Sequence, residues 1–492
     1  GHPKTLNVVY FLPNDYKGPL NQYQRRISKM MSFMQDWFKK EMNHYGFGEK
    51  TFALQRSTQD PNYVKIMVIR GKENRYAYKY EGGGSKAITE INEYYAKNPS
   101  EKGSEHTLVF IPSLTGDGKV NNQGGVPFYG IGKFAFVLDY RYFDVSFHPQ
   151  KRDTANTAWI AGTIHELGHG LNLPHNTQRV SDAFVSLMHD HMVFESNHAK
   201  SHLTYADACL LNTNEVFNKD GHPYYKSQPK VDIKALKIKA DETNIYFNAK
   251  FSATPAIKSV IIYNDPKTSE GDGDYNSVTW ATSEILKAKD GKDSVSFTMA
   301  VADILPQYRQ HPFDMRVRFC HADGTFTTQN YKYVFINGTH ADINEEIFEF
   351  DKLPSQGWSV TATSTNSGSP IGNLFDGDAN SIWHSKWQGS IDPLPHTITI
   401  DMGKQQWVQG MAFTARQDRS DGRPNAVKVE WSTDGTNWKE ALSGGLKDTP
   451  AKQVKKFADA KEARYLRITI ESVYAGTISN PQYTHLAEME LF

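Results

Sequence analysis

Three residues in the segment 165–169 have the types and the spacing needed for metal-dependent hydrolysis. His165 and His169 are four positions apart, so on a helix they lie on one face, one turn apart, where both imidazoles can reach the same zinc ion. Glu166 lies beside them, and a carboxylate there can take the proton of a zinc-bound water and return it to the leaving amine. The spacing predicts a zinc peptidase, whose metal needs a third protein ligand and one open position.

The residues that follow contain a candidate for this third ligand. Residues 165–175 read His-Glu-Leu-Gly-His-Gly-Leu-Asn-Leu-Pro-His, which resembles the metzincin pattern HExxHxxGxxH with its later methionine turn. The resemblance implies that His175 is the third zinc ligand and that Met188 forms the floor beneath the metal. Asn172 replaces the family's glycine, and asparagine is the other residue that best tolerates the left-handed backbone expected at this turn. Pro174 prevents the helix from resuming.

Two roles stay open in this region. Enhancin-like and mucin-degrading peptidases use a glutamate further downstream as the third ligand, and Glu195 could serve here, although His175 would then have no purpose. Some metzincins carry a tyrosine two residues after the methionine that assists the transition state. This chain has Asp190 at that position, and His189 and His191 are the candidate substitutes.

Residues 1–225 are expected to form an α/β catalytic domain of the metzincin kind, a twisted sheet with helices. Runs that predict strands alternate with helical patterns, at residues 5–12, 27–38, 63–70, 86–95 and 107–111. Residues 126–138 predict one further strand at the sheet edge, where a substrate would bind in extended form. Thr204, followed three residues later by Asp207, predicts a capped helix that reaches about Phe217.

Residues 226–340 are expected to form an immunoglobulin-like β-sandwich. Short strands with alternating polar and apolar residues, such as 231–238 and 315–319, repeat through this region. No segment of it predicts chemistry. The run Gly-Asp-Gly-Asp at 271–274 could hold a cation, but a solvated turn is the simpler interpretation.

Residues 347–492 resemble the discoidin, or coagulation factor 5/8 type C, β-jelly roll that family 32 carbohydrate-binding modules use. The motifs that carry the resemblance are Leu-Phe-Asp-Gly-Asp at 374–378, Ile-Trp-His-Ser at 382–385, Glu-Trp-Ser-Thr-Asp-Gly at 430–435 and Ala-Glu-Met-Glu at 487–490. The resemblance implies a structural calcium ion bound by oxygens of Asn373, Asp376, Asp378, Ser381, Ala487 and Glu488. It also implies a sugar site, for which the candidates are His384, Trp387, Arg416 and Tyr483.

The composition limits the remaining classes of function. Lys+Arg and Asp+Glu both number 55, so no net charge attracts nucleic acid or an acidic membrane. No apolar run has the length of a transmembrane helix. Cys209 and Cys320 are expected to be buried free thiols. The opening Gly1-His2-Pro3 is typical of a processing site, which is compatible with an export signal or a lipid anchor removed upstream.

These features predict a secreted or cell-surface zinc endopeptidase acting on glycoproteins, mucins among them. The C-terminal module would bind a glycan and hold the enzyme near its substrate. One alternative is an adhesin that keeps the fold without catalysis, but the intact Glu166 argues against it. Another is a glycoside hydrolase, although the zinc motif has no use in ordinary sugar hydrolysis.

Overall fold

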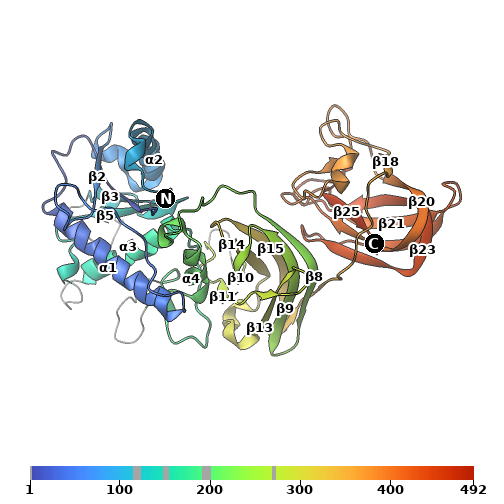
Figure 1. Ribbon diagram of the computed structural model, residues 1–492, viewed down its shortest axis with the longest axis horizontal. Helices are drawn as coiled ribbons and strands as arrows, with labels where there is room; N and C mark the ends of the chain where they lie inside the picture. Colours follow the sequence, from blue (N-terminus) through green and yellow to red (C-terminus); the bar gives the residue numbers. More distant parts are fainter. Residues whose placement is uncertain (1–2, 115–123, 148–153, 191–200, 269–272) are drawn as a thin grey trace.

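The first part of the chain folds around a five-stranded sheet of order β2-β1-β3-β5-β4 (Figure 1). The computed structural model describes residues 3–114, 124–147, 154–190, 201–268 and 273–492. The strands of this sheet are β1 (Asn7–Leu12), β2 (Met67–Arg70), β3 (Thr107–Pro112), β4 (Tyr129–Ile131) and β5 (Phe134–Asp139). Four strands run parallel, and β4 pairs antiparallel at the edge. Every residue of β1 and β3 is buried, which explains their continuous apolar sequence.

The helices of this domain are α1 (Tyr23–His44), α2 (Tyr80–Lys97), α3 (Thr154–Gly170) and α4 (Tyr205–Asn212). The helices predicted at 27–38 and 86–95 are confirmed and lie within α1 and α2. The apolar stripe of α1 is buried in the core, at Ile27, Met30, Met31, Met34 and Phe38. No helix in the described ranges is both long enough and apolar enough to cross a membrane.

Two predicted elements differ from the structure. Residues 126–138 do not form one strand, because the chain turns at Gly132, with φ 56°, and separates β4 from β5. The helix expected to reach Phe217 ends at Asn212. Its start is as predicted: the Thr204 side chain accepts from the backbone of Asp207, and the Asp207 side chain accepts from the backbone of Thr204.

The second domain consists of two antiparallel five-stranded sheets in its described residues. One sheet contains β12 (Leu286–Lys287), β13 (Asp293–Ala300), β9 (Asn244–Thr254), β8 (Lys230–Ala240) and β17 (Asn344–Ile347). The other contains β11 (Val278–Thr282), β10 (Ile257–Pro266), β14 (Phe313–His321), β15 (Phe326–Ile336) and β16 (His340–Asp342). Their apolar faces share one core. Because β17 pairs with β8, the sandwich extends past residue 340, where its end was expected.

The third domain is also built of antiparallel strands (Figure 1). Its main sheet contains β18 (Ser359–Ala362), β20 (His396–Thr414), β21 (Pro424–Ser432), β22 (Lys439–Gly445), β23 (Gln453–Val473) and β25 (Glu488–Leu491). A smaller sheet pairs β19 (Trp383–His384) with β24 (His485–Leu486). Trp383 is fully buried in its core.

Packed contacts join the three domains. Ile261, Tyr263 and Cys320 of the sandwich belong to the same apolar core as the five-stranded sheet of the first domain. Cys320 and Cys209 are both buried free thiols, as predicted. The sandwich also contacts the third domain. Phe492 of the third domain joins the sandwich core and stacks on Phe350, with ring centroids 4.3 Å apart. The first two domains therefore share one core, so a loop of the sandwich can contribute to a site on the catalytic domain.

Candidate active site

Helix α3 carries three of the candidate catalytic residues beside the edge of the sheet. His165 and His169 lie one turn apart on one face, and Glu166 follows His165. The helix packs against β4 and β5. A Cβ atom at Gly130 of β4 would lie only 2.4 Å from the Cβ of His169, so glycine at this position allows the edge strand to pass directly beside the histidines.

The turn after α3 brings the third histidine back to the helix. Asn172 has the left-handed backbone expected from the sequence, with φ 72°. Leu173 N donates to Gly168 O at 2.9 Å, which closes the reversal. As a result, the Nε2 atom of His175 lies 3.0 Å from Nε2 of His169.

The three histidines present their Nε2 atoms to one point. His169 Nε2 is 3.2 Å from His165 Nε2, and the three atoms all lie within 4.8 Å of one another. Each Nδ1 faces a backbone carbonyl: Leu187 O for His165 at 2.7 Å, Leu173 O for His169 at 2.8 Å and Gly273 O for His175 at 2.8 Å.

The carbonyl contacts indicate which ring nitrogen of each histidine faces the point where the three rings converge. A carbonyl only accepts hydrogen bonds, so each Nδ1 must carry the proton and each Nε2 must carry a lone pair. Three lone pairs that converge in this way suit a bound cation. Tetrahedral zinc, with bonds of about 2.05 Å, separates its ligands by about 3.3 Å, which is close to the observed spacings.

Burial favours the neutral forms of His169 and Glu166, which lie at the convergence of the three histidines. Burial and the nearby His175 lower the pKa of His169 to about 4, so its imidazole is neutral at neutral pH, as a metal ligand must be. Burial also raises the pKa of Glu166 well above its usual value. A cation held by the histidines would oppose that effect and favour the carboxylate that a general base requires.

Met188 lies against helix α3. Its side chain is fully buried, and its sulfur would lie 2.8 Å from a Cβ atom at Gly168. The adjacent Leu187 supplies the carbonyl that holds His165. The segment that the resemblance assigned to the methionine turn therefore lies against the helix between the two histidines.

The other residues considered after the methionine have different positions. Nδ1 of His189 lies 2.9 Å from the backbone oxygen of Tyr275, so this histidine contacts the second domain. Asp190 accepts a hydrogen bond from Ser201 Oγ at its backbone oxygen. His191 and Glu195 lie outside the described residues.

Two residues of the sandwich that were not predicted from the sequence, Gly273 and Tyr275, contact His175. Gly273 accepts its Nδ1 proton, and the ring of Tyr275 stacks on it with centroids 3.6 Å apart and an interplanar angle of 19°. The turn predicted at 271–274 is present in its described half, residues 273–274, and Gly273 is exposed. This turn also makes specific contacts: Asp274 pairs with Arg316, with Nη1 and Oδ2 3.1 Å apart. The only sequence signal was the glycine-rich turn itself, because the contact joins two domains.

The predicted calcium ligands lie at the third domain's edge facing the sandwich. The Asp376 carboxylate accepts from Asp378 N at 2.8 Å and from Ser381 Oγ at 2.5 Å. Burial and the neighbouring Asp376 raise the pKa of Glu488 to about 8, and its buried Oε1 atom lacks a hydrogen-bond partner in the described protein. Two adjacent carboxylates with an unused buried oxygen fit a hard cation.

The remaining calcium candidates make hydrogen bonds within the third domain. Asn373 donates its side-chain amide to Ile382 O at 2.9 Å, and Ala487 N donates to Thr414 O. Asp378 accepts from Asn380 N at 3.0 Å.

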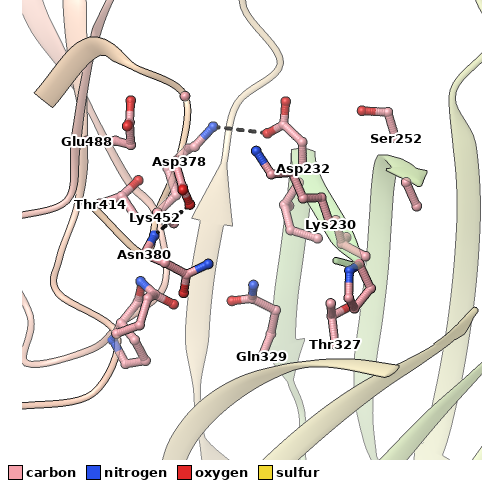
Figure 2. Close-up of a pocket in the computed structure, with 18 of the residues that line it drawn as sticks. Lys230, Asp232, Ser252, Thr327, Gln329, Asp378, Asn380, Thr414, Lys452 and Glu488 are labelled. Carbon is pink, nitrogen blue, oxygen red and sulfur yellow. Dashed lines mark hydrogen bonds and ion pairs between the residues drawn. The ribbon is translucent and has the colours of Figure 1, made fainter. Parts of the chain in front are cut away.

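A cleft of about 590 Å³ separates this loop from the sandwich. Figure 2 shows Asp378, Asn380 and Glu488 on one wall and Lys230 on the other. Lys452 crosses between the domains, with its Nζ 3.3 Å from Asp232 and 2.8 Å from Glu490. The cleft is lined by polar and apolar residues of both domains.

The four candidate sugar-binding residues lie together on the third domain. The His384 ring is 6.0 Å from the Trp387 ring and 5.4 Å from the Tyr483 ring, measured between centroids. Arg416 is close enough to lower the pKa of His384, although burial is the larger cause. Trp387 is 48% exposed, so its face is free to stack on a sugar. Tyr483 donates to Asp421 at 2.7 Å, which adds a carboxylate that the sequence analysis did not include.

The C-terminal domain and the chain as a whole resemble different known proteins. Residues 359–489 match the F5/8 type C domain family. Galactose oxidase of Gibberella zeae is 33% identical over 138 residues, which are 27% of this chain and 20% of that protein. A sialidase of Micromonospora viridifaciens is 28% identical over 120 residues, 24% of this chain and 18% of that protein. The chain thus spans only about a fifth of the length of these curated relatives.

A solved structure covers more of the chain. Wild-type OgpA from Akkermansia muciniphila superimposes with a TM-score of 0.63 at 29% identity, over 70% of this chain and 96% of that chain. A catalytically inactive OgpA in complex with an O-glycopeptide substrate, glycodrosocin, gives the same TM-score at 28% identity, again over 70% of this chain and 96% of that chain. The protein therefore combines a fold similar to that of OgpA, over most of its length, with a C-terminal domain similar to F5/8 type C domains.

Proposed function

We propose that this protein is a zinc-dependent endopeptidase that cleaves glycoproteins, and that it acts outside the cell or at its surface. The observation that carries the proposal is the convergence of three Nε2 lone pairs beside the buried Glu166. The similarity to OgpA, whose inactive form was crystallised with an O-glycopeptide substrate, supports the substrate class. The F5/8 type C similarity supports a glycan as a second partner.

The residues of the site have complementary roles in this proposal. His165, His169 and His175 would hold zinc, which when bound supplies a Lewis acid and an activated water for peptide hydrolysis. Glu166 takes the proton of the attacking water and delivers it to the leaving amine, so that it ends the reaction as a carboxylate again. Among the described strands β4 pairs only with β5, which leaves its outer edge for the backbone of an extended peptide.

The C-terminal domain would contribute binding rather than chemistry. A sugar stacked on Trp387 and hydrogen-bonded by His384 and Arg416 would raise the local concentration of glycoprotein at the active site. Calcium bound by Asp376 and Glu488 would stabilise the loop that faces the sandwich. Both roles are independent of the metal centre in the first domain.

Parallel measurements of metal content and cleavage test the proposal. The wild-type protein should contain one zinc per chain by mass spectrometry and should cleave an O-glycosylated peptide. Glu166→Gln keeps the size of the side chain but removes the base, so it should retain zinc and lose activity by at least about a hundredfold. Zinc binding without cleavage of any glycopeptide would favour the alternative of a glycan-binding adhesin, and activity that survives in Glu166→Gln would contradict the assigned base.

A further inference from the structure

We propose that the sandwich domain completes the metal centre, with Gly273 and Tyr275 acting as positioning residues for His175. Both residues lie between β10 and β11 of the sandwich in sequence, and both contact His175 of the first domain. The inference deepens the proposed function and rests on it, because it concerns the affinity of the same site for its metal.

The three candidate ligands are held in different ways. His165 and His169 belong to α3, and their Nδ1 atoms donate to Leu187 and Leu173 of the same domain. His175 lies beyond the helix, after a left-handed turn. The groups that set its ring orientation come from the second domain: Gly273 O at 2.8 Å and the stacked ring of Tyr275.

The loop is shaped for this close approach. Gly273 has φ +66°, a conformation that residues with a Cβ atom rarely adopt. A Cβ atom there would also lie 3.3 Å from Nδ1 of His175 and 3.2 Å from the Tyr275 ring. Both the backbone conformation and the tight contact with the imidazole therefore favour glycine at this position.

The loop is also anchored on both sides. In the sandwich, Ser277 N donates to Asp274 O at 3.0 Å, and the Asp274 carboxylate pairs with Arg316 at 3.1 Å. From the catalytic domain, Thr177 N donates to Ser277 O at 2.7 Å, and His189 Nδ1 contacts Tyr275 O at 2.9 Å. A group fixed in this way can orient a ligand, because it does not itself need to be ordered when the metal binds.

The expected consequence is a metal affinity that depends on the second domain. A histidine ligand whose Nδ1 proton has a fixed acceptor keeps the correct tautomer and ring orientation, and loss of such a partner typically lowers metal affinity about 10- to 100-fold. Gly273→Ala should displace the carbonyl from His175 and have an effect of this size. Tyr275→Ala should weaken binding through loss of the stacked ring, whereas Tyr275→Phe should preserve it.

Zinc affinity of the full-length protein, measured by competition with a chromophoric chelator, tests the inference without using activity. Gly291→Ala is the matched control, because Gly291 also has positive φ, at +78°, in the same domain, but no atom of the described residues lies within 4 Å of its added Cβ. We expect affinity to fall in Gly273→Ala and Tyr275→Ala and to stay near wild type in Gly291→Ala and Tyr275→Phe. Equal affinity in all four variants would overturn the inference, and Tyr275→Ala decides it if Gly273→Ala does not fold.

A double-mutant cycle identifies the path of the effect. If Gly273 acts through His175, Gly273→Ala should cause no further loss of zinc affinity once His175 has been replaced by alanine. The same loss in both backgrounds would mean a general disturbance of the fold and would overturn the inference. Wild-type protein that binds zinc but cleaves no glycopeptide would refute the proposed function alone, whereas wild-type protein that binds no zinc would refute both.

Discussion

His175 and Tyr275 stack face to face, with ring centroids 3.6 Å apart, although they belong to different domains. The contact belongs to an interface in which Ile261 and Tyr263 of the sandwich share the core of the catalytic domain. Interfaces of this kind behave as a domain core and not as a flexible linker. The catalytic domain and the sandwich are therefore expected to act as one unit.

Gly130→Ala should disturb the active site by pushing the edge strand β4 away from helix α3. The added Cβ would lie 2.4 Å from the Cβ of His169, so β4 and α3 must move apart. We expect kcat/KM on an O-glycosylated peptide to fall at least tenfold, because the substrate strand and the metal ligands lose their common alignment. Gly372→Ala serves as the control, since within the described ranges no atom lies within 4 Å of its added Cβ. Unchanged kcat/KM in Gly130→Ala would argue against β4 as the substrate strand.

The stability of the protein should depend on pH through His106. Its Nδ1 donates to Gly170 O at 2.7 Å, at the end of α3, and its Nε2 accepts from the Tyr225 hydroxyl at 2.8 Å. Burial lowers the pKa of His106 to about 4. The unfolded chain, with a histidine pKa near 6.5, then binds the proton first as the pH falls.

Because the folded protein binds this proton less readily than the unfolded chain, its stability should fall as the pH falls. Stability is fully present above about pH 6.5 and is lost as the pH falls toward 4, and the loss between pH 7 and pH 5 should be about 2 kcal/mol. Urea denaturation at these two values should show it. His106→Gln should be less stable at pH 7 but should lose about 2 kcal/mol less than wild type on acidification. Parallel pH curves for the two proteins would contradict the assignment.

Calcium should stabilise the third domain. Asp376 and Glu488 place two carboxylates together, and a bound cation removes their repulsion. Calcium at about 100 times its Kd should stabilise the folded domain by about 2.7 kcal/mol, measured as a rise in the midpoint of thermal unfolding after metal depletion. Glu488→Gln should be more stable than wild type without calcium and should respond less when calcium is added. A midpoint that does not change with calcium would refute the site.

Trp387→Ala should separate glycan binding from catalysis. The exposed ring is the stacking surface of the candidate sugar site, and loss of one such contact costs about 1.4 kcal/mol, or tenfold in affinity. We expect KM for a mucin-type glycoprotein to rise about tenfold while cleavage of a short glycopeptide stays unchanged. Trp407→Ala is the matched control, because Trp407 is also exposed, at 60%, in the same domain. Equal effects of both changes, or of Trp387→Ala on both substrates, would count against the role.

Local sequence determined the elements that carry the chemistry. Spacing alone placed His165 and His169 on one face of a helix. The resemblance to the HExxHxxGxxH pattern predicted a left-handed turn at residue 172, and asparagine tolerates that conformation. The Thr204 cap was also predicted correctly. These features depend on residues within about one helical turn of one another, so short-range geometry is sufficient to predict them.

Tertiary structure decided what surrounds those elements. Residues 126–138 have the apolar character of one strand, but pairing with β3 and the turn at Gly132 divide them into two. The contacts of Gly273 and Tyr275 with His175 join residues about a hundred positions apart. Such contacts leave no periodic pattern in the sequence, because they depend on how two separately folded domains pack, and that packing is determined by the shape of both surfaces together.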